Sequence, residues 1–202
     1  MIYRMYFKRP IDFILSLFGL IVIFPVLFVF SFLLFLTNHG SPFYYQERPG
    51  KDGEIFYLIK FKTMNDKRDH NGLLLPDMQR LTSIGRFMRS FSLDEFPQLI
   101  NVLRGEMSLI GPRPLLVRYL PLYNVRQARR HEVRPGMSCL PAVNGRNLLS
   151  WEEKFEMDVW YIDHLSFFVD LKILGLTLAK IFKREGINAS ENEVSTPFYG
   201  ES

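Results

Sequence analysis

The chain has 202 residues, a formal net charge of +4 and one cysteine, Cys139. One cysteine excludes an intrachain disulfide, and it is expected to be a small buried residue. No nucleic-acid-binding motif accompanies the basic charge, so we expect no nucleic acid among the partners. A basic chain without such a motif is expected to meet anionic lipid or a phosphorylated small molecule.

An apolar segment at residues 13–37 is the first predicted element, and it contains no charged side chain. As a helix it would rise about 37 Å, enough to cross a hydrocarbon core of about 30 Å. Pro25, at its middle, removes one backbone hydrogen bond and favours a break or a kink. Two arrangements remain open: a kinked span, and a helix-break-helix hairpin whose ends lie on the same face of the membrane.

Basic side chains flank this segment on both sides: Arg4, Lys8, Arg9, Arg48 and Lys51. Basic residues next to a membrane segment mark its cytoplasmic side, so basic flanks at both ends favour the hairpin. We therefore expect an N-terminal re-entrant anchor in contact with membrane lipid. Asp12, just before the apolar segment, is expected to pair with one of the nearby cations at the level of the headgroups.

After the anchor, two short strands are expected at residues 43–46 and 55–60, joined as a β-hairpin by a polar turn. A helix follows over residues 83–90. A second helix is predicted to begin at Ser92. Its apolar face has the spacing i, i+3, i+4 and i+7: Phe96, Leu99, Ile100 and Leu103.

Glycine and proline interrupt the chain at residues 105–114 and 134–147, which are predicted as loops. Ser150 and Glu153 form a capping-box signature for the helix that comes next. A last helix is predicted at residues 169–184, where a leucine-rich stripe lies beside lysines. This pattern is typical of a helix on a membrane surface and, equally, of a helix that faces a core.

Asp94 and Glu95 occupy the second and third positions of the helix predicted from Ser92. One interpretation is structural: Ser92 and Glu95 would form a capping box, and acidic residues favour a helix N-terminus. The other interpretation is chemical. Peptide N–H groups at the helix start would lower the pKa of Asp94 and keep it ionised as a nucleophile or a metal ligand, while Glu95 would transfer protons.

Two arginines near these acids would supply the cations that a phosphoryl group needs: Arg89 and Arg113. Arg113 lies between Pro112 and Pro114, whose fixed φ angles reduce the entropy lost in holding the side chain in place. The structural alternative for Arg113 is a surface turn with a solvated side chain.

Residues 89–114, taken with residues 60–64, 134–136 and 143–147, resemble the bacterial sugar transferase family, the monotopic phosphoglycosyl transferases. The short chain with one hydrophobic segment resembles the small PglC-type members of the family. Those enzymes start glycan assembly in protein N-glycosylation. Several separated motifs in the order of the family make this resemblance more specific than any one of them.

The residue patterns and the resemblance together predict an α+β fold, mostly helical. It would combine an N-terminal re-entrant (helix-break-helix) membrane anchor, a short β-hairpin and surface amphipathic helices. The predicted membrane re-entrant helix covers residues 1–40. A catalytic phosphoglycosyl transferase domain on the cytoplasmic face is predicted at residues 41–185, and a polar, mobile tail at residues 186–202. The implied location is the bacterial inner (cytoplasmic) membrane, and a homodimer remains open.

The resemblance implies a ping-pong reaction in two steps. Asp94 would attack the β-phosphorus of a UDP-sugar, release UMP and carry a covalent phosphosugar. Glu95 would act as general base toward a polyprenyl phosphate, typically undecaprenyl phosphate, whose oxygen then displaces Asp94. The family uses Mg²⁺, for which Asp94 is the expected protein ligand. The implied substrate-binding residues are Lys60, Arg89, Pro112, Arg113 and Arg146.

The donor implied by the small PglC-type enzymes is an N-acetylated amino sugar, such as a bacillosamine derivative. Two alternatives stand beside it. The first keeps the chemistry and uses a UDP-hexose donor. The second is a non-catalytic membrane scaffold, whose basic residues would hold anionic lipid.

Two segments depart from the family pattern. Phe24 precedes Pro25 where the family has serine, so no hydroxyl is present to satisfy a freed carbonyl. In residues 137–142, Cys139, Pro141 and Ala142 replace a glycine, an alanine and a glutamine. This loop is expected near the nucleotide or the sugar, so its changes bear most directly on sugar preference.

Overall fold

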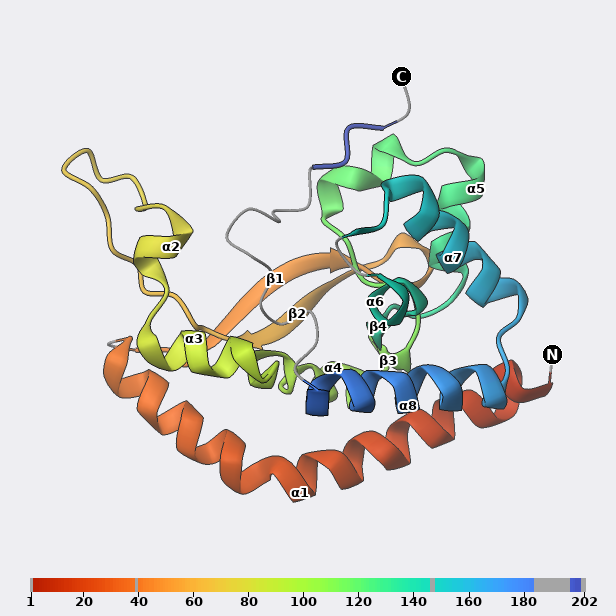
Figure 1. Cartoon of the computed structure of the whole chain (residues 1–202), viewed down its shortest axis with the longest axis horizontal. Coiled ribbons are helices and arrows are strands. Elements are labelled where there is room, and N and C mark those ends of the chain that lie inside the picture. Colours follow the sequence, from red (N-terminus) through yellow and green to blue (C-terminus); the bar gives the residue numbers. More distant parts are fainter. Residues whose placement is uncertain (1, 39, 146–147, 184–196, 201–202) are drawn as a thin grey trace.

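The computed structural model describes residues 2–38, 40–145, 148–183 and 197–200. Its helices are α1 (Lys8–Thr37), α2 (Asp77–Arg80), α3 (Ser83–Ser90), α4 (Gln98–Arg104), α5 (Val125–Ala128), α6 (Leu140–Asn144), α7 (Trp151–Asp163) and α8 (Phe167–Lys183). Its strands are β1 (Phe43–Pro49), β2 (Ile55–Phe61), β3 (Ser108–Ile110) and β4 (Gly136–Ser138). Helices dominate and the strands are short, as predicted (Figure 1).

Helix α1 lies along one side of the molecule and curves around it, with α8 beside its N-terminal part (Figure 1). A π-helical turn, Tyr3–Phe7, leads into it. The helix is continuous through Pro25, so the break predicted there is a bend instead. A proline inside a helix removes one hydrogen bond, but the bonds on either side of it keep the helix intact.

Both ends of α1 contact the folded domain. Near its N-terminus, Asp12 is buried and its Oδ2 accepts a hydrogen bond of 2.7 Å from the hydroxyl of Ser108. Near its C-terminus, Leu34 is fully buried in an apolar cluster. Just past the helix, Asn38 Nδ2 donates to the carbonyl of Lys62 at 2.7 Å. The concave side of the helix is therefore attached to the domain at both ends.

A buried polar network joins α1 to α8. Lys8 Nζ lies 3.2 Å from Asp12 Oδ1 and 2.7 Å from Asp170 Oδ2, so the cation that pairs with Asp12 is Lys8. The hydroxyl of Tyr161 donates to Asp170 Oδ1 at 2.7 Å and lies 3.0 Å from the carbonyl of Ile110. Because every charge in this network has a partner of opposite sign, α1, α8 and β3 are held in a fixed relation.

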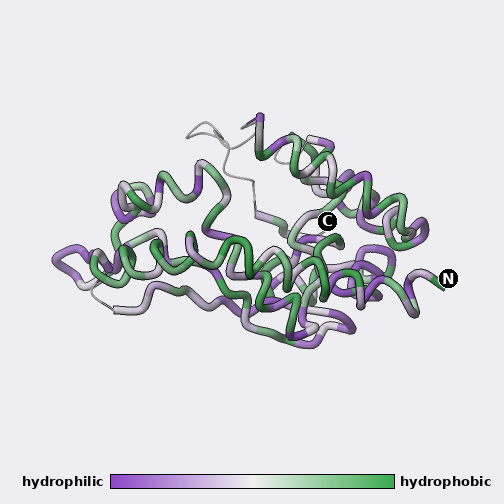
Figure 2. The backbone as a smooth tube through the Cα atoms, turned by 90° about the horizontal axis from the view of Figure 1, so that it is seen from below, coloured by the Kyte–Doolittle hydropathy of each residue, from purple (hydrophilic) through white to green (hydrophobic). Residues whose placement is uncertain are grey.

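The opposite side of α1 exposes large apolar side chains. Phe18 and Phe28 are 66% and 64% exposed, and Phe168 of α8 is 78% exposed. The tube that starts at the N-terminus is coloured hydrophobic along most of α1 when this side is viewed in Figure 2. Among the described residues, Tyr3–Thr37 is the helical segment long and apolar enough to cross a membrane, with a mean hydropathy of 2.9.

Strands β1 and β2 pair in antiparallel register, with Tyr45 opposite Ile59. The free edge of β2 is covered by Asn101 of α4, which is fully buried. Its Oδ1 accepts from the backbone N–H of Ile59 at 3.0 Å, and its Nδ2 donates to the carbonyl of Tyr57 at 2.8 Å. One side chain thus replaces a neighbouring strand and fixes α4 against the hairpin.

The helix predicted to begin at Ser92 is divided in two. Leu93–Glu95 forms a 3₁₀ turn, and α4 begins only after Pro97. Ser92 has a left-handed backbone (φ 55°) and its side chain makes no capping bond, so the predicted capping box is wrong. The physical reason is Pro97, which lacks the N–H that a continuous α-helix would need at this position, although Phe96 before it keeps helical backbone angles.

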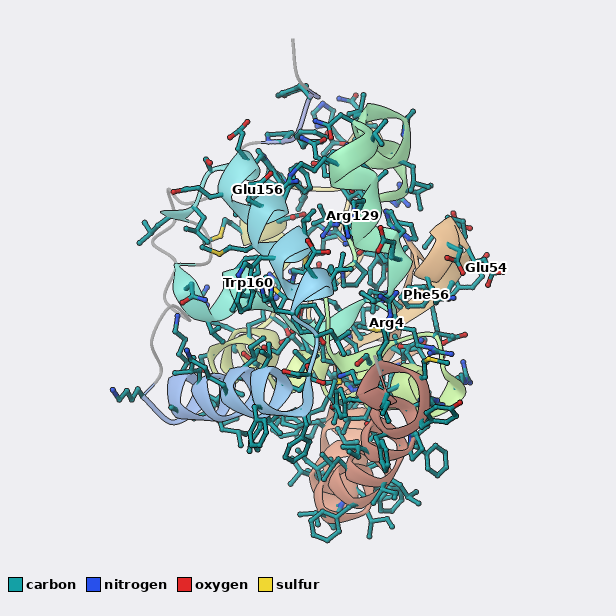
Figure 3. The ribbon with its side chains drawn as sticks, turned by 90° about the vertical axis from the view of Figure 1, so that its right-hand side faces the viewer. Arg4, Glu54, Phe56, Arg129, Glu156 and Trp160 are labelled. Atoms are coloured by element: carbon teal, nitrogen blue, oxygen red, sulfur yellow. The ribbon has the colours of Figure 1, made fainter. Side chains whose placement is uncertain are left out.

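The C-terminal half contains a second sheet, in which β3 and β4 are parallel, within segments predicted as loops. Helix α7 begins with the predicted capping box between Ser150 and Glu153. Of the segment predicted as a polar, mobile tail, the structure describes residues 197–200, where Phe198 is buried against Tyr119 and Phe155. The charged residues Arg129 and Glu156 lie in the part of the molecule away from α1 and α8 (Figure 3).

Candidate active site

Three of the predicted site residues meet in one ion-pair cluster. Lys60 comes from β2, Glu95 from the 3₁₀ turn, and Arg113 from the loop after β3. Lys60 Nζ and Arg113 Nη2 each lie 2.9 Å from the same oxygen, Glu95 Oε1. The side chains are 21%, 26% and 45% exposed, respectively, so the cluster is open to solvent on the arginine side.

Arg113 is fixed through its backbone rather than through its side chain alone. The carbonyl of Pro112, which is buried, accepts from the N–H of Gly136 at 2.9 Å. A Cβ on Gly136 would lie 2.1 Å from the backbone nitrogen of Gly111, so only glycine permits this approach of the two strands. Arg130 Nη2 donates to the carbonyl of Arg113 at 2.8 Å.

Arg130 is itself held by a buried ion pair with Asp158 of α7. Their closest atoms are 2.8 Å apart, and each side chain is 4% exposed. The guanidinium also lies 5.6 Å from the ring centre of Tyr123 and 5.3 Å from that of Phe155. The pair therefore anchors the Arg113 loop to α7 from the inside of the protein.

Arg89 lies at the end of α3 and also acts on the acidic pair. Its Nε donates to the hydroxyl of Thr63 at 3.0 Å. Helix α3 approaches that segment closely, since a Cβ on Gly85 would lie 2.1 Å from the carbonyl oxygen of Thr63. The charge of Arg89 acts on Asp94, where it favours the ionised carboxylate.

The two carboxyl groups have opposite electrostatic environments. Burial acts to raise the pKa of Glu95, but the charges and hydrogen bonds of Arg113 and Lys60 outweigh it and lower the pKa below its usual range. For Asp94, burial and the adjacent charge of Glu95 raise the pKa, and Lys60 and Arg89 only partly oppose this. The predicted lowering of the Asp94 pKa by a helix start is therefore wrong in direction, because burial and the charge of Glu95 outweigh the groups that favour the ionised carboxylate.

A cavity of about 370 Å³ opens beside Arg113. The charged residues of its wall are Arg48, Arg113, Arg130, Lys154 and Asp158, and its aromatic residues are Tyr119, Trp151 and Phe155. The two kinds are interleaved, since Arg130 lies over the ring of Phe155 and Lys154 over that of Trp151. A cavity of this size, with cations and flat apolar rings in its wall, suits a ligand that carries both phosphate and a ring.

The segment that departs from the family pattern lies in this wall. Cys139, Pro141 and Ala142 all line the cavity. Cys139 is buried, and burial together with the charge of Asp158 raises the pKa of its thiol to about 11. The thiol is therefore neutral and a structural part of the wall, as expected, rather than a nucleophile.

Asp94 is the carboxylate best suited to a divalent cation. None of the ion pairs among the described residues includes it, and the repulsion from Glu95 would be relieved by a positive ion. The part of the chain that the structure describes holds no group of three or more His, Cys, Asp or Glu side chains placed for a metal. Mg²⁺ commonly takes one or two carboxylates and completes its shell with substrate phosphate and water, so Asp94 fits that ion.

The structure thus brings together Lys60, Glu95 and Arg113 by direct contact, with Asp94 and Arg89 next to them. Pro112 supports the loop through its backbone. Arg146 lies outside the described residues. The sequence analysis did not assign Arg48 or Arg130 to the site. Each of them contacts site residues that are distant in the chain, and no local sequence motif marks either arginine.

Comparisons with known proteins give one matching family and several relatives. The profile of the bacterial sugar transferase family matches residues 3–184. The chain is 51% identical over 197 residues to EpsL of Bacillus subtilis, an uncharacterized sugar transferase, and 97% of each chain is covered. It is 36% identical over 198 residues to a UDP-galactose-lipid carrier transferase of Erwinia amylovora. It is 37% identical over 189 residues to a UDP-glucose:undecaprenyl-phosphate glucose-1-phosphate transferase of Klebsiella pneumoniae.

These relatives differ in how much of their length is matched. The match to the Erwinia and Klebsiella proteins covers 90% and 89% of this chain but 41% of each relative. The chain therefore corresponds to less than half of those two proteins, and to nearly all of EpsL.

Proposed function

Because the chain belongs to the bacterial sugar transferase family and is a phosphoglycosyl transferase, we propose that it transfers a sugar-1-phosphate from a UDP-sugar to a polyprenyl phosphate. Undecaprenyl phosphate is the proposed acceptor, and UMP is the product released. The observation that carries this proposal is an unpaired carboxylate, Asp94, placed beside three cations: Lys60, Arg89 and Arg113. The reaction would be the first membrane step in assembling a glycan.

In the first step, an oxygen of Asp94 forms a bond to the β-phosphorus of the donor. The bond between that phosphorus and the oxygen bridging to the α-phosphate breaks, and UMP leaves with the electron pair. In the second step, a phosphate oxygen of the acceptor forms a bond to the same phosphorus, and the aspartyl bond breaks. Arg89 and Arg113 stabilise the charge on the transferred group.

In this scheme Glu95 has two roles, and the first is to position two cations. Its ionised carboxylate holds Lys60 and Arg113 within 2.9 Å before the donor arrives. While it is bound to both cations, a lowered pKa makes it a weak base. Donor phosphate would compete for the same cations, and Glu95, once released from them, can accept a proton from the acceptor.

Mg²⁺ is proposed as the cofactor, with Asp94 as its protein contact. When bound, the ion would neutralise charge on the donor phosphates. The measurement is UMP release with and without EDTA: chelation is expected to stop the reaction, and added Mg²⁺ is expected to restore it. Full turnover in EDTA would remove the metal from the proposal.

We also propose that α1 is a re-entrant anchor, with the domain on the cytoplasmic face of the bacterial inner membrane. Two observations support it. Both ends of α1 are attached to the same domain, through Asp12 and Leu34, and the outer side of the helix exposes apolar residues. A domain bound to both ends of a helix cannot lie on opposite sides of a bilayer, and the basic flanks favour the cytoplasmic side.

Cysteine labelling tests this topology. Ile2 and Ser41 are exposed at the two ends of the helix, and Cys139 is buried, so its background labelling is expected to be low. In Ile2→Cys and Ser41→Cys, an impermeant maleimide is expected to label both positions from the cytoplasmic side. Labelling of the two positions from opposite sides would show a span.

The donor sugar has two candidates. The sequence resemblance implies an N-acetylated amino sugar and an N-glycosylation pathway. The names of the Erwinia and Klebsiella relatives mention galactose and glucose, and this favours the alternative of a UDP-hexose. The replaced residues in the cavity wall, Pro141 and Ala142, are consistent with a changed sugar preference.

A panel of UDP-sugars tests the function and the donor together. The purified protein is incubated with undecaprenyl phosphate, Mg²⁺ and each donor, and UMP is measured. Release of UMP with one class of donor, dependent on acceptor for multiple turnovers, is the expected result. No release with any donor would support the alternative of a non-catalytic scaffold.

A further inference from the structure

Arg48, near the end of β1, is a cation whose charge is not balanced by any carboxylate in contact with it. Its Nη2 donates to Gln46 Oε1 at 2.6 Å, and its Nη1 donates to the carbonyl of Pro114 at 3.3 Å. Both acceptors are neutral. Its Nε is buried and makes no hydrogen bond to any residue that the structure describes. No ion pair between described residues includes Arg48 either.

The surroundings of Arg48 make this arrangement costly. Burial, and then the charge of Arg113, lower the pKa of Arg48 to about 10, against weaker opposing effects that include Glu95. A partly buried cation beside a second cation destabilises the folded protein unless a negatively charged group lies between them. Glu95 opposes this only weakly, as the smallest of these effects on Arg48, and its Oε1 already contacts Lys60 and Arg113.

Arg48 and Arg113 both line the cavity beside the active site. The cavity also contains the aromatic rings of Tyr119, Trp151 and Phe155. Strand β1 packs against the 3₁₀ segment Val117–Leu122, which contains Tyr119, and Arg48 bonds to the carbonyl of Pro114, so Arg48 is close to both the aromatic residues and the Arg113 loop. An anion in the cavity would therefore meet two guanidinium groups at once.

We propose that Arg48 is a donor-binding residue that contacts a phosphate of the UDP-sugar together with Arg113. This inference rests on the proposed phosphoglycosyl transfer, and it adds a binding residue to that site. The ligand class is a nucleoside diphosphate: its phosphates neutralise the two arginines and its rings face the aromatic wall. A guanidinium suits this role because its planar set of N–H donors matches phosphate oxygens.

A purely structural role for Arg48 is the competing explanation. In that case its bond to the carbonyl of Pro114 holds the Arg113 loop, and removing the side chain destabilises the protein. The donor-binding role predicts the opposite for the free protein. Replacing Arg48 with a neutral residue removes the repulsion from Arg113 and leaves the melting temperature unchanged or higher, while binding of the donor weakens.

Three variants separate these roles: Arg48→Gln, Arg48→Lys and the control Arg118→Gln. Arg118 is a nearby exposed arginine that lies over the ring of Tyr119 and is outside the cavity lining. For each, donor KM, acceptor KM and kcat are measured, with the Tm in the presence and absence of UMP. Arg48→Gln is expected to raise the donor KM about tenfold or more and to reduce stabilisation by UMP. Its acceptor KM and its Tm without ligand should stay close to those of the wild type.

Arg48→Lys keeps the charge without the planar fork, so its donor KM is expected to lie between those of the wild type and Arg48→Gln. Arg118→Gln should behave as the wild type. The inference is wrong if Arg48→Gln keeps the wild-type donor KM and response to UMP. It is equally wrong if that variant lowers the Tm of the free protein and shifts both KM values alike. A wild type that releases no UMP and gains no stability from UMP would overturn the proposed function as well.

Discussion

Arg113 is held by two groups of charges that differ in almost every physical respect. On its guanidinium side, Glu95 contacts Arg113 and Lys60 in a cluster that is partly exposed. On its backbone side, Arg130 pairs with Asp158 in a site where both side chains are 4% exposed. The first group has more cations than its one paired carboxylate can neutralise. The second group is closed and satisfied by its own hydrogen bonds.

This difference separates binding from positioning. An open group with excess positive charge is left for an anionic ligand, and the unpaired carboxylate of Asp94 stands next to it. Arg130 and Asp158 also line the cavity, but their charges neutralise each other, and Arg130 holds Arg113 in place through the carbonyl of that residue. Changes in the first group should therefore affect reaction and binding, whereas changes in the second should affect stability first.

The largest expected effect is on activity. Asp94→Asn keeps the size of the side chain and removes the nucleophile, so turnover should fall by about four orders of magnitude or more. The Tm should not fall, because the variant also removes the repulsion between Asp94 and Glu95 that raises the Asp94 pKa. UMP release and a melting curve measure both. An inactive variant that is also unfolded would contradict the assignment of Asp94 to the reaction and not to stability.

The second effect is on stability. Asp158→Asn leaves the charge of Arg130 buried without its partner, which typically costs about 3–5 kcal/mol. Denaturant unfolding measures this. The matched control on the same helix is Asp163→Asn, which breaks an exposed pair with Arg129 and should leave the unfolding midpoint nearly unchanged. Equal effects of the two substitutions would show that burial does not distinguish them.

A smaller effect on stability is expected at Phe198, whose ring packs on the Phe155 ring next to the buried ion pair. Its ring lies 5.1 Å from that of Phe155, which in turn lies under the guanidinium of Arg130. Phe198→Ala should cost about 1–3 kcal/mol, below the usual value for a buried phenylalanine, because a short end segment can detach by itself. Tyr199→Ala is the control, since Tyr199 is 81% exposed. A stable Phe198→Ala variant would show that this contact contributes little.

The smallest effect is a pH dependence at Glu95. Its pKa is below the ordinary value of 4.5 in the folded protein, so its ion pairs stabilise the fold above about pH 4.5. This contribution is lost as the pH falls through the folded-state value. The Tm difference between wild type and Glu95→Gln should be constant from pH 8 to about pH 5 and should shrink at lower pH. A difference that grows on acidification would have the wrong sign.

The sequence predicted the elements whose signals are local. The capping box at Ser150, the β-hairpin and the apolar N-terminal helix all follow from short patterns. The helix predicted from Ser92 failed because two local signals conflict, and Pro97 outweighs the serine. The parallel pair of β3 and β4 was missed because each strand has three residues and the pairing joins distant segments.

The site shows the same limit. Residue types and a family resemblance identified Asp94, Glu95 and Arg113. These signals indicate what chemistry a side chain can perform, but they do not show which side chains lie next to one another. The ion pair of Arg130 and Asp158 joins residues 28 apart in the chain, and no spacing rule predicts it. The direction of the Asp94 pKa also depends on burial and on the position of Glu95, which only three-dimensional structure supplies.

The central claim is that Asp94 becomes covalently bonded to the phosphosugar. Intact-mass spectrometry of the wild type, incubated with its UDP-sugar donor and Mg²⁺ but no acceptor, tests it directly. We expect a mass gain equal to one phosphosugar, located on Asp94 by peptide mapping, lost on addition of undecaprenyl phosphate and absent in Asp94→Asn. A protein that forms product in the full reaction but acquires no such adduct, or acquires it on another residue, would contradict the account.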